Sequence, residues 1–203
     1  MPSVAETIRS LKPNVSREEA LRHFTAGIRG MAANCSRGRA RSLAELYIPY
    51  RLFHVTIRNS GREETTIYAL DAVEGTLDLF EFPEPPGERE LVPLQTRNVL
   101  PSRLKADQAR KRLLDKVRRV VFSRGFARLR DLQMAAQAVP GDLYVPYWVC
   151  FRGADYAAHL EILDAVRRRP EGTKVRRLVE DWLRSSPTVL SATESIFSDD
   201  SRA

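Results

Sequence analysis

Two short motifs occur twice in this chain, in the same order, and they constrain the fold more than any other feature. The run LYIPY at residues 46–50 returns as LYVPY at residues 143–147. Downstream, LDAV at residues 70–73 returns letter for letter at residues 163–166. The separations, 97 and 93 residues, are nearly equal. Self-similarity at a near-constant spacing indicates an internal duplication.

The first copy has the pattern of a helix followed by strands. Ser16 is a good N-cap, and Glu19 stands three residues later as its capping-box partner. Residues 46–58 and 65–73 are rich in aromatic and β-branched side chains, which is typical of strands. Residues 76–82 alternate apolar and polar positions, so a third strand is predicted there.

The second copy repeats the hairpin and then diverges. A helix is predicted over 104–124, with one apolar stripe that includes Phe122, and a shorter helical segment over 126–138. Strands follow at 143–152 and 158–166. Residues 173–184 then form an amphipathic helix in place of a strand. Hairpins imply antiparallel pairing, so the expected class is α+β, with two repeats of helix plus antiparallel hairpin.

The run PEPPG at residues 83–87 cannot continue a regular element, which favours a linker between the copies. The two copies either pack as a pseudo-dimer or form separate lobes. We expect a first repeat at 1–82, a Pro-rich linker at 83–101, a second repeat at 102–186 and a flexible tail at 187–203.

These patterns resemble the PepSY domain. The run SREEA at residues 16–20 resembles that family's helix start, and LDAVEGTL at 70–77 resembles its closing strand turn. In the second copy KADQA at 105–109 and LDAV at 163–166 take these places, with Gly172 following late. The resemblance implies a domain that binds or inhibits peptidases and has no catalytic residues of its own.

The prolines of the repeated motif lie inside predicted strands, although proline belongs at an edge, a first residue or a bulge. We expect the flanking rings to pack on the helix of their own repeat. The alternative is a groove for a ligand or partner, with an open strand edge nearby that accepts a partner strand. The groove residues would be Tyr47, Pro49, Tyr50, Tyr144, Pro146, Tyr147 and Trp148.

Asp71 and Asp164 each end a predicted strand and precede a turn. Short acidic side chains accept hydrogen bonds from backbone N–H groups a few residues on, so we expect both carboxylates to hold the chain reversal. A pair of catalytic carboxylates would have to lie about 5–10 Å apart. Nothing in the sequence brings these two together.

The net charge of +7 comes from the second half of the chain. Residues 103–130 hold 11 basic side chains against two acidic ones. A charged helix face is most often simply solvated. The alternative is a surface for nucleic acid or another polyanion. Its contacts would be Arg110, Lys111, Arg112, Lys116, Arg118 and Arg119.

The sequence shows no targeting segment and no cysteine motif. Residues 1–11 contain no apolar leader, and no apolar run is long enough to span a bilayer. Cys35 and Cys150 belong to no CxxC or Cys/His cluster. We therefore expect a cytoplasmic protein without a zinc site or a disulfide framework.

No catalytic motif stands out, and the three histidines are not spaced for a metal. The favoured hypothesis is a binding or interaction protein, without catalytic residues or cofactor, for a peptide or protein partner. One alternative is a nucleic-acid or polyanion binder acting through residues 103–130. The other is an enzyme with a pocket between the repeats.

Overall fold

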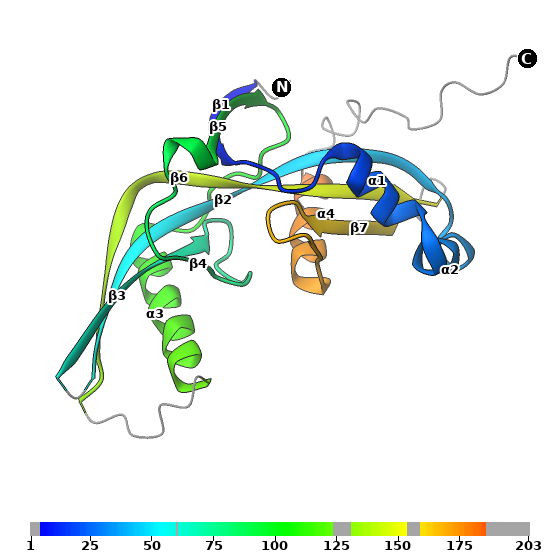
Figure 1. Ribbon diagram of the computed structural model, residues 1–203. Helices are drawn as coiled ribbons and strands as arrows, with labels where there is room; N and C mark the ends of the chain where they lie inside the picture. Colours follow the sequence, from blue (N-terminus) through cyan, green and yellow to red (C-terminus); the bar gives the residue numbers. More distant parts are fainter. Residues whose placement is uncertain (1–4, 60, 124–130, 154–158, 186–203) are drawn as a thin grey trace, which may run out of the picture. The chain divides into compact units, whose positions relative to one another are not determined.

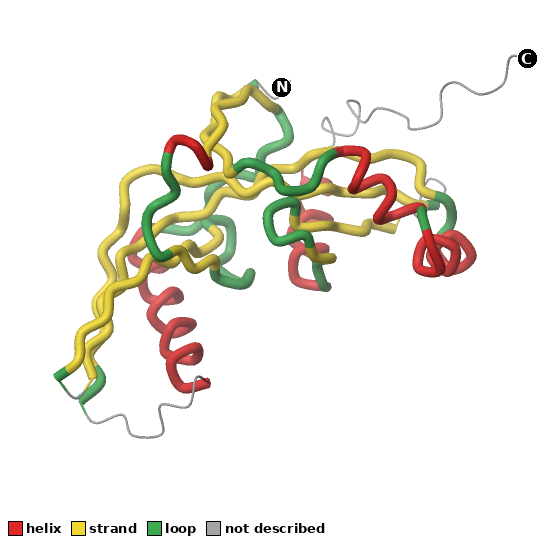
Figure 2. Tube along the Cα trace, viewed as in Figure 1, coloured by secondary structure: helices red, strands yellow, loops and turns green. Residues whose placement is uncertain are grey.

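The computed structural model describes residues 5–59, 61–123, 131–153 and 159–185, and it has the expected α+β class (Figures 1 and 2). Within these residues no helix is both long and apolar enough to cross a membrane. The elements, in chain order, are β1 (Glu6–Leu11), α1 (Arg17–Thr25), α2 (Gly27–Arg37), β2 (Ala40–Asn59), β3 (Arg62–Asp71), β4 (Phe80–Phe82), the 3-10 turn η1 (Glu88–Glu90), β5 (Leu91–Thr96), α3 (Ala106–Ser123), β6 (Gln133–Arg152), β7 (His159–Asp164), β8 (Arg169–Pro170) and α4 (Thr173–Ser185).

The strands join in one sheet whose order is β4-β3-β2-β6-β1-β5, with β7 paired to β6 and β8 paired to β7. The hairpins β2–β3 and β6–β7 are antiparallel, as the repeated motifs predict. β2 and β6 are each 20 residues long, well beyond the usual strand length. Both prolines of the repeated motif lie in the interior of these two strands.

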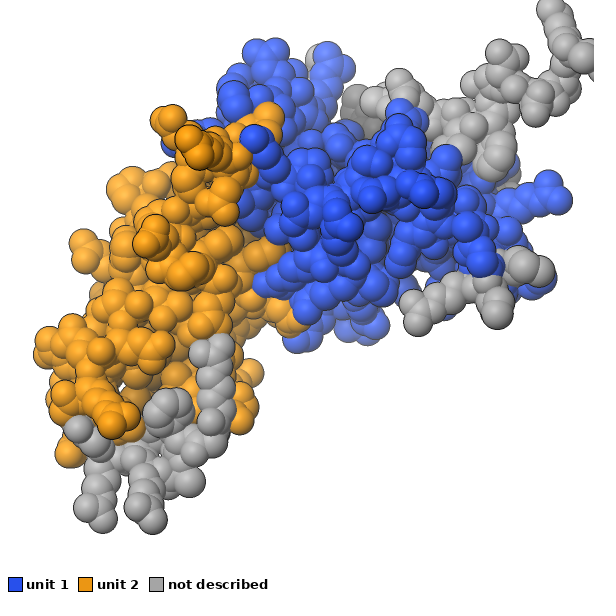
Figure 3. Space-filling model, viewed as in Figure 1, with its two compact units in different colours: residues 1–47, 93–100, 145–203 blue, residues 48–92, 101–144 orange. Residues whose placement is uncertain are grey.

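The chain forms two compact units, and each draws on several segments (Figure 3). Unit 1 comprises residues 1–47, 93–100 and 145–203. Unit 2 comprises residues 48–92 and 101–144. This division differs from the sequential one at 82, 101 and 186, because β2 and β6 each contribute residues to both units.

In unit 2, α3 packs on the hairpin β2–β3. Four side chains at helical spacing form its buried stripe, namely Ala109, Leu113, Val117 and Val121. They lie in one core cluster with two residues from each strand, namely Phe53, Val55, Tyr68 and Leu70. The predicted helix and its apolar stripe are thus present, apart from Phe122.

In unit 1, α1 packs on strands β6 and β7. The predicted capping box opens this helix: Glu19 N–H donates to Ser16 Oγ at 3.2 Å, and Ser16 N–H donates to Glu19 Oε2 at 2.8 Å. The buried side chains of α1 are Ala20 and Phe24. They share a core cluster with Trp148 and Cys150 of β6 and with Leu163 and Ala165.

Two helices, α1 and α3, therefore pack on the hairpin that is remote from them in the sequence. The N-terminal α1 lies with β6 and β7, and α3 lies with the earlier β2 and β3, as the colours of Figure 1 show. The tyrosines that flank the repeated prolines belong to neither of these two clusters, so the expectation that these rings pack on the helix of their own repeat stays a prediction. The apolar faces are as predicted, but the partners are exchanged.

The two LDAV motifs occupy the same position in their hairpins. Tyr50 pairs with Asp71 in the β2–β3 ladder, and Tyr147 pairs with Asp164 in the β6–β7 ladder. The N–H of Ala72 donates to the carbonyl of Pro49 at 2.8 Å. Likewise, the N–H of Ala165 donates to Pro146 at 3.1 Å.

The chain also enters the helix in the same way in both units. The carbonyl of Ala72 accepts from the N–H of Leu104 at 2.9 Å, just before α3. The carbonyl of Ala165 accepts from the N–H of Asn14 at 2.7 Å, just before α1. The duplication itself remains a prediction, and these matching contacts are what it would explain.

The chain departs from the predicted elements in three places. Residues 133–138 belong to strand β6 where a helical segment was expected, and residues 124–130 lie outside the described part. The strand predicted at 76–82 is reduced to Phe80–Phe82. The predicted linker contains η1 and β5. Met134 and Ala136 of β6 pack into the α3 core, so tertiary pairing overrides local helix propensity here.

Candidate functional site

The residues predicted to line a groove are almost all core residues. Six are buried, and Tyr144 is half-buried. Tyr50 packs edge-on against Phe80, with ring centroids 5.1 Å apart. The hydroxyl of Tyr47 donates to Glu45 at 2.9 Å, and burial raises its pKa well above the ordinary value. Rings enclosed in this way offer no surface to a ligand. The buried groove residues are Tyr47, Pro49, Tyr50, Pro146, Tyr147 and Trp148.

The strand edges beside the two prolines are occupied. β2 lies between β3 and β6 in the sheet order. The carbonyl groups of Pro49 and Pro146 accept hydrogen bonds from the LDAV segments described above. Proline has no N–H donor but keeps its carbonyl acceptor, so each of these two prolines bonds to its neighbour through the carbonyl alone. A partner strand would have to add elsewhere.

Asp71 holds the turn after β3 as expected. Its Oδ1 accepts from the N–H groups of Glu74 and Gly75, each at 2.8 Å. Its Oδ2 accepts from the N–H of Leu77 at 2.8 Å. Gly75 has φ +66°, which a residue with a side chain rarely adopts. The fully buried carboxylate thus satisfies three backbone donors in one reversal.

Asp164 also holds the turn that follows its strand, but only one of its two carboxylate oxygens accepts hydrogen bonds from the described part of the chain. Its Oδ1 accepts from the N–H groups of Val166 at 2.8 Å and Arg167 at 2.7 Å. Its Oδ2 is buried and has no hydrogen-bond partner in the described residues, and Arg167 Nε lies 4.0 Å from it. Burial raises the pKa of this carboxyl, and the hydrogen bonds and nearby arginines oppose that rise without cancelling it.

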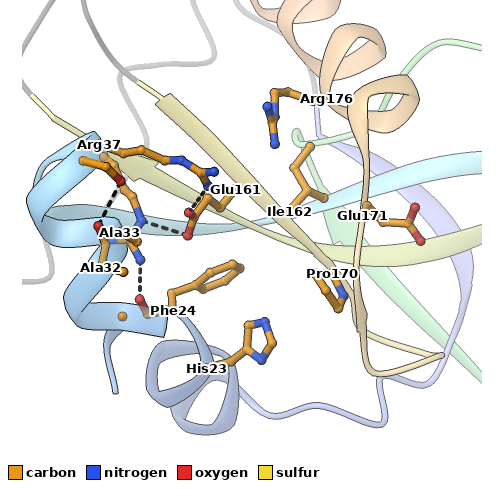
Figure 4. Close-up of a pocket in the computed structure, with 13 residues that line it drawn as sticks. His23, Phe24, Ala32, Ala33, Arg37, Glu161, Ile162, Pro170, Glu171 and Arg176 are labelled. Atoms are coloured by element: carbon orange, nitrogen blue, oxygen red, sulfur yellow. Dashed lines mark hydrogen bonds and ion pairs between the residues drawn. The ribbon is translucent and has the colours of Figure 1, made fainter. Parts of the chain in front are cut away.

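Unit 1 contains a pocket of about 340 Å³ (Figure 4). Its walls come from α1, α2, β6, β7 and the segment that leads from β8 into α4. Charged and ring side chains form one part of the lining, and Phe24, Ile162 and Pro170 form the apolar part. The size lies at the low end of the range typical of small-molecule sites. The charged and ring members of the polar part are His23, Arg37, Arg152, Glu161, Glu171 and Arg176.

Arg152 is the fixed cation of this pocket, and its side chain is completely buried. Its Nε donates to Glu161 Oε2 at 2.8 Å, and its Nη1 donates to Asn34 Oδ1 at 2.9 Å. The carbonyl of Phe24 accepts from Nη2. Arg37 Nη1 donates to the other oxygen of Glu161 at 2.8 Å. A buried charge needs such pairing, so Arg152 and Glu161 tie α1 and α2 to the strands.

Arg176 is the pocket cation that remains unsatisfied. It extends from the first turn of α4 toward the pocket (Figure 4). Its Nε is buried and has no hydrogen-bond partner within the described part of the chain. The sequence analysis did not single out this pocket. One available signal was Arg152 at the end of the apolar run Val149–Phe151, because an arginine in such a strand requires an acidic partner.

The predicted polyanion contacts on α3 divide into two groups. Arg112 donates to the carbonyl of Glu74, and Lys116 donates to the carbonyl of Leu77, so both hold the turn organised by Asp71. Arg118 lies 4.0 Å from Asp115, one turn away on the same helix. Three further residues are exposed and have no ion pair within the described residues, namely Arg110, Lys111 and Arg119.

Phe122 is not part of the apolar stripe, contrary to expectation. It is 55% exposed and is the one large hydrophobic side chain exposed in the described residues. Lys111, Arg118, Arg119 and Phe122 are spaced i, i+7, i+8 and i+11, which places them on one face of α3. We call these four residues the α3 outer face. It combines three cations with one open aromatic ring.

Comparisons with known proteins identify no relative: no protein-family model, no curated protein and no solved structure matches this chain. The PepSY resemblance therefore remains a prediction. In the described residues no group of three His, Cys, Asp or Glu side chains is arranged to hold a metal ion. The α3 outer face and the unit 1 pocket are the two sites on which a function can be argued.

Proposed function

We propose that this protein is a binding protein without catalytic residues that contacts single-stranded nucleic acid through the α3 outer face. The observation that carries the proposal is the exposure of Phe122 on the same face of α3 as Lys111, Arg118 and Arg119. An exposed aromatic ring offers a flat face on which a base can stack. Cations around an open ring match a nucleic-acid strand, which offers phosphates and base faces together.

The positions of the cations support this choice of partner. Lys111 and Arg119 are exposed and have no acidic partner in the described residues, and Arg118 is only loosely paired with Asp115. Arginine gives bidentate phosphate contacts, and its guanidinium also stacks on bases. The predicted peptide or protein partner has less support, because the groove residues are buried and the adjacent strand edges are occupied.

The proposal includes a cytoplasmic location. Both cysteines are free, Cys35 on the surface and Cys150 in the core. Unpaired cysteines are typical of a reducing compartment, where RNA is also accessible.

The test is fluorescence anisotropy of a labelled single-stranded oligonucleotide with the full chain. We expect binding that weakens with salt, with a logarithmic slope of about −2 for three phosphate contacts. Phe122→Ser should weaken binding roughly 5- to 150-fold at every salt concentration, because a stacked base contributes about 1–3 kcal/mol. Lys111→Gln/Arg119→Gln should instead flatten the salt dependence.

Arg9→Gln is the matched control, since Arg9 is an exposed cation on β1 in the other unit. It should leave the affinity unchanged within twofold. Absence of binding at low salt contradicts the proposal, and so does an equal loss in Arg9→Gln and Lys111→Gln/Arg119→Gln. Preferential binding to anionic lipid vesicles over the oligonucleotide would assign the same face to a membrane surface instead.

A further inference from the structure

We propose that the unit 1 pocket binds a small organic anion, a carboxylate or a phosphate ester with a compact apolar body, and that Arg176 is its principal contact. This site is separate from the α3 outer face and does not depend on the proposed function. Its volume of about 340 Å³ suits a ligand of this size.

The charge balance of the pocket favours an anion. Glu161 is shared by Arg152 and Arg37, so its two oxygens are committed. Oε1 of Glu171 lies 3.4 Å from Arg169 Nε, so this carboxylate also has a cation beside it. Arg176 is left as the lining arginine whose Nε–H is buried without an acceptor in the described residues. An oxyanion would satisfy that donor and the adjacent Nη–H together, as a bidentate pair does.

The apolar lining of the pocket determines which group the anionic headgroup of the ligand can carry. Phe24 of α1 and Ile162 of β7 are buried side chains that line the pocket, and Pro170 adds to this apolar part. The ring of His23 packs edge-on against Phe24, with centroids 5.4 Å apart. A flat or compact apolar group would contact these residues while its anionic end reaches Arg176. Inorganic ions would use only half of the site.

Hydrogen bonds of Arg152 hold the α1 and α2 walls of the pocket in place. Arg152 donates to Asn34 on α2 and to the carbonyl of Phe24 on α1. These bonds hold two pocket walls before any ligand arrives. A preorganised wall lowers the entropic cost of binding. Arg176, on α4, contributes a buried Nε–H that has no acceptor in the described residues.

The experiment is an NMR titration of the uniformly ¹⁵N-labelled full chain with three probes: benzoate, phenyl phosphate and benzamide. Benzamide has the shape of benzoate without its charge. We expect benzoate or phenyl phosphate to shift amide signals of α4 and β7 in a saturable way. The tighter of the two anions identifies the headgroup. Benzamide should bind at least tenfold more weakly.

Two variants on one helix make the assignment specific. Arg176→Gln should weaken anion binding at least tenfold. Arg177→Gln removes the same charge one residue away, where the side chain is exposed and does not line the pocket, and should change the affinity less than twofold. Arg176→Lys keeps the charge but loses the bidentate guanidinium geometry, so its anion affinity should lie between those of Arg176→Gln and Arg177→Gln. Thermal unfolding of each variant checks that the fold is retained.

Three outcomes overturn the inference. One is the absence of saturable shifts with either anion. Another is an equal response to benzamide and benzoate, since the pocket would then recognise shape and not charge. The third is an equal loss in Arg176→Gln and Arg177→Gln, which would reduce the effect to the general charge of α4.

Discussion

The indole N–H of Trp148 donates a hydrogen bond to the carbonyl of Val15 at 3.0 Å, across 133 residues of sequence. The bond lies beside the start of α1, whose buried Ala20 and Phe24 belong to the same core cluster as Trp148. Unit 1 is therefore closed by contacts between the first and the last third of the chain. In unit 2 the order along the chain is the opposite: the later helix α3 covers the earlier hairpin β2–β3.

This exchange predicts that the two sequence halves fold only together. A break after Glu84 yields fragments 1–84 and 85–203, which separate α1 from Trp148 and α3 from Phe53. Each fragment alone leaves a hairpin face uncovered, so we expect neither to show a cooperative unfolding transition. Co-expressed, they should elute as one complex by gel filtration. Cooperative unfolding of either isolated fragment would show that the repeats are self-sufficient.

Leu113 is completely buried at the centre of the α3 core, so Leu113→Ala should create a cavity there. We expect the free energy of unfolding to fall by about 2–5 kcal/mol. Gln108→Ala, an exposed change on the same helix, should stay within about 0.5 kcal/mol of the wild type. Urea denaturation followed by circular dichroism measures both, and similar values for the two would place α3 outside the core.

Asp71 accepts three backbone N–H groups in one buried turn. Asp71→Ala leaves those donors without an acceptor, and an unsatisfied buried donor costs about 1–3 kcal/mol. We expect a loss of at least that size in urea denaturation. Asp78→Ala is the matched control, because Asp78 is an exposed acid just beyond the same turn. Asp78→Ala should change stability far less than Asp71→Ala does.

Asp164 should make stability depend on pH. Burial raises its folded-state pKa above the ordinary 3.8, so the folded chain takes up this proton more readily than the unfolded chain. As pH rises from 3.8 through the raised value, the folded state loses stability, and the loss is constant above that value. Arg167 and Arg169 act against the shift and are outweighed.

Asp164→Asn keeps the Oδ1 acceptor and removes the ionisation. The stability of this variant relative to the wild type should therefore increase as pH rises through the same window and then level off. Urea denaturation of both proteins between pH 3.5 and 7 measures the difference. A difference that does not vary with pH would mean that Asp164 is not desolvated.

The two cysteines should react at very different rates. Cys35 is exposed on α2, whereas Cys150 is buried and burial raises its pKa to about 11. A disulfide reagent such as DTNB needs an accessible thiolate. We expect one fast thiol in the native protein and two in denaturant, with the fast one absent in Cys35→Ser. Two fast thiols in the native wild type would contradict the burial of Cys150.

The parts of the fold that could be predicted from the sequence are those that depend on residues close to one another in the chain. The capping box of Ser16 and Glu19, the turns at Asp71 and Asp164, and the apolar stripes of α3 and α4 depend on neighbours within a few residues. The predicted helix over 104–124 agrees closely with α3 at 106–123. Strands β1 and β5 were missed, because short strands of six residues carry little pattern of their own and depend on the strands beside them.

The candidate sites were less accessible to sequence reasoning. The basic residues of α3 could be recognised, but Arg112 and Lys116 turned out to serve a nearby turn. Phe122 fits the apolar stripe by composition, yet the structure leaves it exposed on the opposite face. The unit 1 pocket combines residues from six elements, and no spacing in the sequence reveals that combination.

The sequence by itself determined the α+β class, the two hairpins, and the helix faces that need an apolar partner. Only the tertiary structure decided which partner each face received: α1 covers β6 and β7, and α3 covers β2 and β3. The physical reason is that apolar burial has no direction of its own. A periodic stripe records that a surface must leave water, while the choice among similar hairpins depends on how the whole chain packs.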